Sequence, residues 1–511
     1  LKGYAFRLVA FVSKFNRDIR MNRHGEPLPS ARKVRTELHS TGRVEDKVTF
    51  NVAAFHMMEF IHRDISIMDG PLDYLKRRQY CCSKIGDKDP KCIPIRVPED
   101  DPYLKVTDIR CLNFSRAETF QDSGCTPEII LPEQINYQTP VIDLSTIYGV
   151  DYQELAKVRK FEDGLLILEQ RENRYVPANI TIMSNFTKSM KNINKKKLAN
   201  MTANMLVDTI ANIIADSMIG MVSDLVTKDT TNVSESICIQ NNDTESVCYQ
   251  FGYRNMVNNG LLSENVEHVS TYDAEAVPLV YAEYDIAVRY FHTFLDGRIK
   301  TYTESYHYKD EYSYSETLFR SGLLEKGKIL EELNRGIFHQ YAAKIDDIQD
   351  PDISENYYGK KLQRAHDLPA IDIQRGRDMG VRGYNDYRHM CGLKPAKKFR
   401  DLIDVMDIEK VEALKKLYDK VDDIDLLAGI MSENDIQGIH VGPTLFCIMT
   451  KQLQIFRYSD RFWFERGDQF HSFTLGQLHE IRKTNMARFA CDNAEGIKYL
   501  QPQAFMSVRP G

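Results

Sequence analysis

The sequence lacks an apolar run that is long enough to cross a membrane. The stretch that comes closest, 205–226, is interrupted by Asp208, Asp216 and Asp224, whereas a spanning helix needs about 20 consecutive, mainly apolar residues. The apolar residues of this stretch recur at the period of an α-helix, which predicts an amphipathic helix with one face in the core. We therefore expect no membrane-spanning segment.

Basic patches, linkers and strand-like patterns are also scarce. The 511 residues carry a net charge of −6 and no basic stripe, so nucleic acid is not an expected partner. No tract rich in proline, glycine and serine divides the chain, so we expect residues 1–511 to form one domain with a large core. Apolar residues mostly recur at helical rather than strand spacing, which predicts a mainly α fold.

Helical spacing is spread along the chain, whereas one region favours loops. Residues 86–140, which are rich in proline, aspartate and cysteine, are predicted to form loops held by disulfides. The predicted helices are 51–65, 151–160, 187–227, 274–296, 322–345, 384–390, 409–418, 445–457 and 475–487.

The sequence contains ten cysteines and six Asn-x-Ser/Thr sequences, five of which lie between 179 and 242. One such sequence often arises by chance, but six together with an even number of cysteines favour a secreted glycoprotein. The chain does not begin with a signal peptide, so we expect a mature or incomplete N-terminus. The predicted glycosylation sites are Asn113, Asn179, Asn185, Asn200, Asn232 and Asn242.

A short segment on the predicted helix 51–65 carries three consecutive ionisable residues, His62, Arg63 and Asp64. Successive helical residues are rotated by roughly 100°, so these side chains point in three directions and can serve three partners. Taken alone, such a segment is usually a helix end with solvated charges.

Residues 367–393, DLPAIDIQRGRDMGVRGYNDYRHMCGL, strongly resemble the fingerprint of the animal haem peroxidase family. The resemblance covers most of the chain and implies the mainly α fold of that family. It is weakest at 178–270, where the helical pair that the family places between its active-site arginine and its proximal histidine is essentially missing. The predicted helical sequence at 187–227 is a partial replacement, so we expect a remodelled cavity. Other similar segments, in the family's order, are 25–38, 81–103, 133–149, 287–295 and 460–483.

The resemblance implies a haem site around His292, in the segment VRYFHT. His292 matches the axial ligand of the iron, although a histidine on an apolar helix is more often an ordinary core residue. Asp372 matches the residue that orients this imidazole, where many members have asparagine, and a carboxylate would lower the iron potential. Arg254 partly matches the active-site arginine, because the family's Gly-Asp-x-Arg is shortened here to Gly-Tyr-Arg. A surface arginine is an equally compatible interpretation.

The residues that match the catalytic side of the haem are altered. The family pattern Gln-Phe-x-Asp-His-Asp aligns with 59–64, which places Arg63 in the slot of the distal histidine. That histidine moves a proton of hydrogen peroxide, whereas arginine cannot be deprotonated in a protein. His62 and Val257 replace the two carboxylates that esterify haem in some members, so any haem would be held without those bonds. A shift by one residue would restore His62 but would misplace Asp64.

The resemblance also implies a calcium site. Residues 139–145, TPVIDLS, match the family's calcium loop, and Asp64 matches the ligand that follows the distal histidine. Calcium prefers several oxygen ligands, which the loop and helix supply. The alternative is a loop with ordinary aspartate and serine caps. The predicted ligands are Asp64, Thr139, Val141, Asp143 and Ser145.

The cysteines agree with the family's disulfide pattern. The resemblance pairs Cys391 with Cys447 and Cys238 with Cys248, whereas the order within Cys81, Cys82, Cys92 and Cys111 stays open. Cys125 and Cys491 are left over. They pair with each other, or Cys125 joins a second chain in a homo-oligomer.

Three functional hypotheses remain. The first is a secreted, glycosylated, calcium-binding pseudoenzyme with a binding or structural role outside the cell, carrying haem or another small apolar ligand. The second is a haem peroxidase that oxidises phenolic or halide donors, with Arg63 and Arg254 polarising the peroxide and His62 or water carrying the proton. The third, an unrelated α-helical secreted protein, conflicts with the length of the match at 367–393. No catalytic residue is assigned under the first hypothesis, which we favour.

Overall fold

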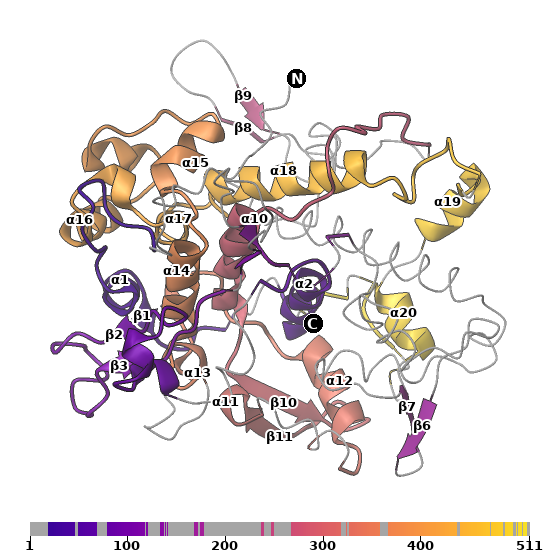
Figure 1. The fold of residues 1–511 in the computed structure, drawn as a ribbon. Coiled ribbons are helices and arrows are strands. Elements are labelled where there is room, and N and C mark those ends of the chain that lie inside the picture. The colour runs from indigo at the N-terminus through magenta and orange to yellow at the C-terminus, as the bar shows by residue number, and fades with distance from the viewer. Residues whose placement is uncertain are drawn as a thin grey trace.

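The computed structural model is built mainly of helices, as the spacing predicted (Figure 1). Among the described residues, one large hydrophobic cluster collects side chains from Leu28 to Met506, and no helix there is long and apolar enough to span a membrane. The structure describes residues 19–45, 50–68, 79–117, 267–317, 326–357, 366–436, 440–470, 472–483 and 486–493, together with 119–120, 133–136, 138, 140–141, 168–171, 174–177, 237–239, 247–249, 323, 497, 499–502 and 504–507.

The α-helices of the described residues are α1 (Ala31–Leu38), α2 (Val52–Ile65), α10 (Ala282–Ala287), α11 (Tyr314–Thr317), α12 (Ile329–His339), α13 (Pro351–Ser354), α14 (Leu368–Asp378), α15 (Tyr384–Met390), α16 (Ile408–Leu417), α17 (Leu426–Ile430), α18 (Pro443–Ser459), α19 (Leu475–Ile481) and α20 (Met486–Asn493). The 3-10 helices are η1 (Tyr80–Cys82), η2 (Gly86–Lys88), η4 (Val288–Phe294), η7 (Phe399–Asp404) and η8 (Val421–Asp423).

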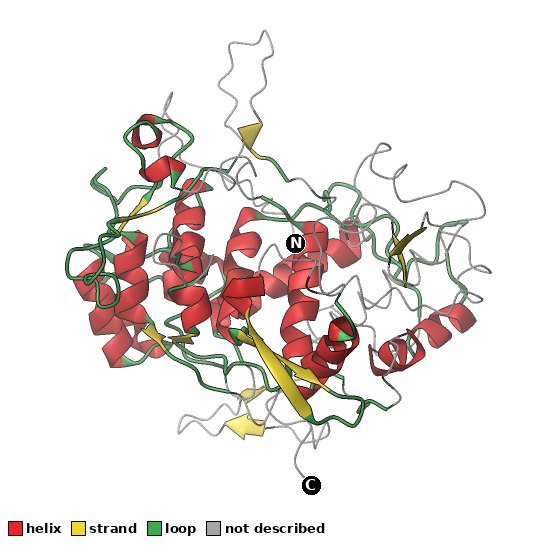
Figure 2. Cartoon of the chain, turned by 90° about the horizontal axis from the view of Figure 1, so that it is seen from below, coloured by secondary structure: helices red, strands yellow, loops and turns green. Residues whose placement is uncertain are grey.

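The strands form short two-stranded pieces rather than a continuous sheet (Figure 2). One pair is parallel and the others are antiparallel. The pairs are β1 (Ser40–Thr41) with β12 (Ile348–Gln349), β2 (Ile95–Arg96) with β3 (Cys111–Leu112), β4 (Thr119–Phe120) with β5 (Glu133–Gln134), β6 (Leu168–Arg171) with β7 (Arg174–Pro177), β8 (Ile237–Ile239) with β9 (Val247–Tyr249), and β10 (Arg298–Tyr302) with β11 (Tyr308–Ser313).

Helix α2 begins at a buried asparagine that joins three distant segments. The side-chain oxygen of Asn51 accepts a hydrogen bond from the backbone nitrogen of Ala53 (3.1 Å), as a helix N-cap does. Its amide nitrogen donates to the carbonyl oxygens of Phe338 (3.0 Å), Ala504 (2.7 Å) and Met506 (3.1 Å). These bonds fix the start of α2 between α12 and the C-terminal segment.

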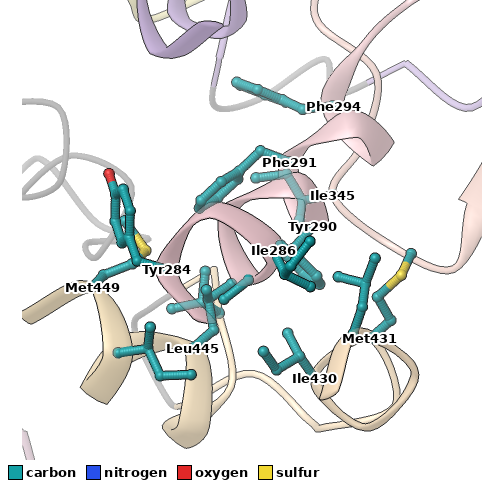
Figure 3. Close-up of a cluster of buried hydrophobic side chains, with 14 of the residues drawn as sticks. Tyr284, Ile286, Tyr290, Phe291, Phe294, Ile345, Ile430, Met431, Leu445 and Met449 are labelled. Atoms are coloured by element: carbon teal, nitrogen blue, oxygen red, sulfur yellow. The ribbon is translucent and has the colours of Figure 1, made fainter. Parts of the chain in front are cut away.

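Helix α10 continues directly into η4, and together they form a buried support for the candidate site. Figure 3 shows their apolar side chains, among them Ile286 and Tyr290, packed beside α17 and α18. The helix predicted at 274–296 starts only at Ala282, because Pro278 disfavours helical backbone before it. Packing against two other helices therefore sets the position of everything that η4 carries.

Helix α14 lies against α10 and α1, and buried charges hold its first turn (Figure 1). Asp367 caps the helix through the backbone nitrogen of Ala370 (3.0 Å). Its carboxylate also accepts from Arg32 (2.7 Å) and Arg35 (2.7 Å) of α1, both of which are fully buried. Buried ion pairs are costly to break from one side only, so α1 and α14 hold each other in register.

Most predicted helices that fall on described residues are present. The predictions at 51–65, 384–390, 409–418 and 445–457 agree with α2, α15, α16 and α18 to within two residues at each end. The helix predicted at 322–345 is shorter, as α12, and the one at 475–487 is divided into α19 and α20. The predictions at 151–160 and 187–227, including the amphipathic stretch at 205–226, lie outside the described residues.

Three disulfides staple the described chain. Cys81 bonds Cys92 and Cys82 bonds Cys111, which settles the order that the sequence left open, and these two bonds hold the loops at 79–117 as predicted. The predicted bond between Cys391 and Cys447 is also present. The register of β8 and β9 places Cys238 opposite Cys248. Cys125 lies outside the described residues, and Cys491 is on α20.

Candidate functional site

The candidate site is built around His292, which lies in η4 and whose side chain is 15% exposed. Its Nδ1 lies 2.6 Å from Oδ2 of the buried Asp372 on α14. A carboxylate accepts a hydrogen, so in a neutral imidazole this contact puts the proton on Nδ1 and leaves the lone pair on Nε2. Within the part of the chain that the structure describes, Nε2 has no hydrogen-bond partner. This is the arrangement that an axial ligand of a metal requires.

Arg289 links this pair to a second carboxylate. One turn before His292, its Nη1 donates to Oδ1 of Asp372 (3.0 Å) and its Nη2 donates to Oδ2 of Asp285 (3.0 Å). Its Nε also donates to the backbone oxygen of Asp285 (3.2 Å). Both carboxylates are 1% exposed, so their negative charges depend on this guanidinium.

Helix α2 brings a second group of charges to the site. Glu59 and Arg63 form an ion pair one turn apart, with Oε1 2.8 Å from Nε and both side chains 31% exposed. Burial alone would raise the pKa of Glu59, but Arg63, followed by His292 and His62, lowers it to about 2. The pairing with Arg63 therefore keeps Glu59 ionised on this face of α2.

His62 is turned toward Asp285. Its Nε2 lies 3.3 Å from Oδ1 of Asp285, and the hydroxyl of Ser66 donates to the same oxygen. Burial lowers the pKa of His62 by more than the nearby carboxylates raise it. Among the described residues, its buried Nδ1 has no hydrogen-bond partner. The imidazole is therefore neutral at physiological pH and committed to Asp285 through Nε2.

The structure brings together four of the site residues predicted from the sequence: His62, Arg63, His292 and Asp372. Arg254 lies outside the described residues.

Two further residues of the site, Asp285 and Arg289, were not predicted. Their signal was the spacing of opposite charges at i and i+4, which favours an ion pair on a helix. His56, one turn before Glu59 on α2, was also not predicted. Burial lowers its pKa to about 4.

The predicted calcium site is described only in part. Asp64 is fully buried near the end of α2, and Val141 is half-buried, whereas Thr139, Asp143 and Ser145 lie outside the described residues. The described residues contain no group of three or more His, Cys, Asp or Glu that could hold a metal ion.

A contact that the sequence did not suggest ties the two parts of this predicted calcium site together. The side chain of Asn136 donates to the carbonyl of Ile65 (2.8 Å) and accepts from the nitrogen of Ile67 (2.9 Å). Residues just before the predicted loop are thereby fixed beside Asp64.

Asn113 is the predicted glycosylation site that the structure describes. Its side chain is 8% exposed, and its Oδ1 accepts a hydrogen bond from the backbone nitrogen of Cys81 (2.7 Å). A glycan would have to displace this contact, so the fold disfavours glycosylation of Asn113. The other five lie outside the described residues.

The sequence and the structure are similar to those of known peroxidases. The sequence profile described as animal haem peroxidase matches residues 7–212 and 245–505. A peroxidase of Drosophila melanogaster is 30% identical over 95% of this chain and 73% of its own length. The human peroxidasin homolog is 26% identical over 97% of this chain, which spans only 35% of that protein.

Two solved structures show the same fold. Peroxidase A of Dictyostelium discoideum has a TM-score of 0.68 at 18% identity and covers 97% of this chain and 95% of its own. The fatty acid alpha-dioxygenase of Oryza sativa has a TM-score of 0.66 at 18% identity, covering 94% of this chain and 80% of its own. At these identities the likeness concerns the fold alone.

Proposed function

The chain belongs to the animal haem peroxidase family, as its fingerprint predicted, and we propose that it is a haem-binding pseudoenzyme of that family. It acts outside the cell as a calcium-binding, glycosylated binding or structural protein. The observation that carries this proposal is the pairing on α2: Arg63 holds Glu59, and His62 holds Asp285. Arg63 is thereby held as a cation that cannot act as a base, and Nε2 of His62 is directed at Asp285.

The residues around His292 fit haem. With its Nδ1 on a carboxylate, the imidazole of His292 would offer Nε2 to a haem iron. When bound, haem would supply the redox centre for peroxide chemistry. His292 would hold the iron and Asp372 would fix the ring. His62 and Val257 cannot form the ester bonds of some relatives, so the haem would be held without covalent attachment.

Peroxide cleavage needs a proton-transferring base in addition to bound haem. A base with a pKa near working pH must take a proton from the peroxide and return it to the leaving oxygen, which contributes a factor of about 10²–10⁴. Arg63 cannot lose its proton. His62 directs its Nε2 to Asp285 instead. The arrangement therefore supports haem binding without efficient turnover.

The proposed calcium site joins α2 to the segment after Asn136. Asp64 supplies a buried carboxylate, and the loop supplies oxygens from Thr139, Val141, Asp143 and Ser145. The bonds of Asn136 to the end of α2 support this assignment because they bring the loop's approach beside Asp64.

The proposed extracellular location is supported by the disulfides and the predicted glycosylation sites. Three disulfides in the described chain favour an oxidising compartment, and the acceptor asparagines add support. We propose a single domain over 1–511, since one hydrophobic cluster reaches from Leu28 to Met506. Cys125 is the residue through which a second chain would be joined.

The visible absorption spectrum of the purified protein tests the proposal. We expect a Soret band after reconstitution with haem, with negligible peroxide-dependent oxidation of phenols or halides. His292→Ala should lose the band, with haem affinity reduced by more than the roughly 10–100-fold typical of losing a residue that only orients a ligand. His307→Ala, on the exposed hairpin, should keep it.

Three results would contradict the proposal. No Soret band at saturating haem would refute haem binding. A band that survives His292→Ala would refute the assigned ligand. Fast oxidation of a phenolic or halide donor would establish the competing function, an active haem peroxidase.

A further inference from the structure

We propose that Asp285 is a positioning residue that sets the electron donation of His292 through Arg289 and Asp372. Four contacts in series join α2 to the candidate haem ligand. This inference rests on the proposed haem binding at His292 and goes beyond it, because it assigns a role to a carboxylate that does not touch the ligand.

The series begins on α2 and ends at η4. His62 Nε2 lies 3.3 Å from Oδ1 of Asp285, and Oδ2 of Asp285 accepts from Nη2 of Arg289 at 3.0 Å. Nη1 of Arg289 donates to Oδ1 of Asp372 at 3.0 Å, and Oδ2 of Asp372 accepts from Nδ1 of His292 at 2.6 Å. Each carboxylate thus uses one oxygen toward Arg289 and the other toward an imidazole.

The series is buried at its centre and more open at its ends. Asp285 and Asp372 are 1% exposed and Arg289 is 8% exposed, whereas the two histidines are 14% and 15% exposed. Charges interact strongly where water does not screen them. The guanidinium of Arg289 faces both carboxylates. A change in the charge of one carboxylate therefore alters how strongly Arg289 compensates the negative charge of the other.

This sharing controls the hydrogen bond to His292. When Arg289 compensates Asp372 more fully, the carboxylate becomes a weaker acceptor, and the imidazole gains less anionic character. A less anionic imidazole donates less charge to iron, which raises the iron potential. Asp285 therefore strengthens His292 as a donor by drawing Arg289 partly away from Asp372.

Ser66 and His62 hold Asp285 from the side of α2. The hydroxyl of Ser66 donates to the oxygen of Asp285 that faces His62. Since Ser66 immediately follows the last residue of α2, the charge of Asp285 is fixed relative to that helix. An ion pair whose role were only structural would stabilise the fold without affecting the bond between Asp372 and His292.

Two variants test the proposal with readouts that do not need turnover. In the haem-free protein, Asp285→Asn should shift the His292 Nδ1 proton resonance upfield, because the hydrogen bond to Asp372 weakens. In the ferrous haem protein it should lower the iron–histidine stretching frequency and raise the potential. Ser66→Ala removes a hydrogen-bond donor from Asp285 but leaves its charge. It should therefore shift the Nδ1 resonance, the stretching frequency and the potential in the opposite directions, and by less. Asp285→Glu should restore the wild-type values.

Glu59→Gln is the matched control. It removes a carboxylate that is coupled to His292 through space but lies outside the series. We expect a raised potential with an unchanged stretching frequency and an unchanged Nδ1 resonance.

The outcomes separate this inference from the proposed function. If haem binds through His292 but neither Asp285→Asn nor Ser66→Ala moves the Nδ1 resonance, the inference is wrong and the haem site stands. If the resonance moves as expected but no Soret band forms, the coupling of Asp285 to His292 is supported and the proposed haem binding is wrong. If Asp285→Asn does not fold, Ser66→Ala alone decides.

Discussion

The two sides of the candidate site use their charges in opposite ways. On the side of η4, the contacts of Asp372 and Arg289 orient His292 and leave its Nε2 with a lone pair. On the side of α2, the contacts pair Arg63 with Glu59 and His62 with Asp285. We interpret the first side as suited to bind a metal, whereas the second side directs its ionisable side chains at carboxylates.

Under the proposed function, this difference separates a ligand site from a catalytic site within one fold. The ligand side depends on packing of α10, η4 and α14, which also forms the core (Figure 3). The catalytic side depends on two adjacent residues of α2, His62 and Arg63. The proposed loss of chemistry would leave the scaffold intact, because it changes only these residues.

Restoring a base at position 63 should produce the largest effect. We expect Arg63→His, combined with Glu59→Gln so that no partly buried carboxylate is left unpaired, to raise peroxide-dependent oxidation of a phenol by a factor of about 10²–10⁴. The measurement is the steady-state rate of haem-reconstituted protein.

Arg63→Lys with Glu59→Gln is the control for this restoration, because lysine keeps a positive charge without supplying a base. It should show no gain. Equal rates in the two double variants would mean that the missing base does not limit the chemistry.

Calcium should stabilise the α2 side by an intermediate amount. A ligand present at 100 times its dissociation constant stabilises a fold by about 2.7 kcal/mol, so chelation should lower the melting temperature of the wild type. Asp64→Asn and Asp143→Ala should melt at the same temperature with and without calcium. Asp100→Asn, at an exposed turn, should respond like the wild type. A wild type that ignores chelation would refute the site.

The ion pair on α2 should have the smallest effect, and only in acid. The folded pKa of Glu59 is lowered to about 2 from its ordinary 4.5. A lowered carboxyl pKa gives stability that is present above about pH 4.5 and is lost as the pH falls toward 2. The melting temperature of haem-free Glu59→Gln should therefore decline less steeply over that range than that of the wild type. Parallel curves would show that Arg63 does not hold Glu59 ionised.

Helical spacing predicted much of the fold but missed helices with buried charges. Helix α2 has apolar residues on its buried face, so its pattern was clear in the sequence. Helix α1 instead buries Arg32 and Arg35, and α14 buries Asp372 and Arg377. Charges at core positions interrupt the apolar period, so spacing alone shows no helix there. Partners from distant segments make these positions tolerable, and one sequence does not reveal those partners.

The same limit applies to the candidate site. The family resemblance located His292 and Asp372, whose contact the structure contains. It did not suggest Asp285 of α10, which lies between Arg289 of η4 and His62 of α2. Such a role depends on how two helices meet. A pattern along the chain records only the spacing between Asp285 and Arg289.

The cap of α2 constrains how the protein can be made. The amide of Asn51 bonds the carbonyl of Ala504, which follows it by 453 residues. A ribosome that adds roughly 5–20 residues per second needs about 20–90 seconds to supply that partner. During this interval the start of α2 cannot complete its native bonds. A nascent chain of this protein therefore exposes an incompletely capped α2 until residue 504 has been added, which makes assistance by chaperones during that interval the natural order of events.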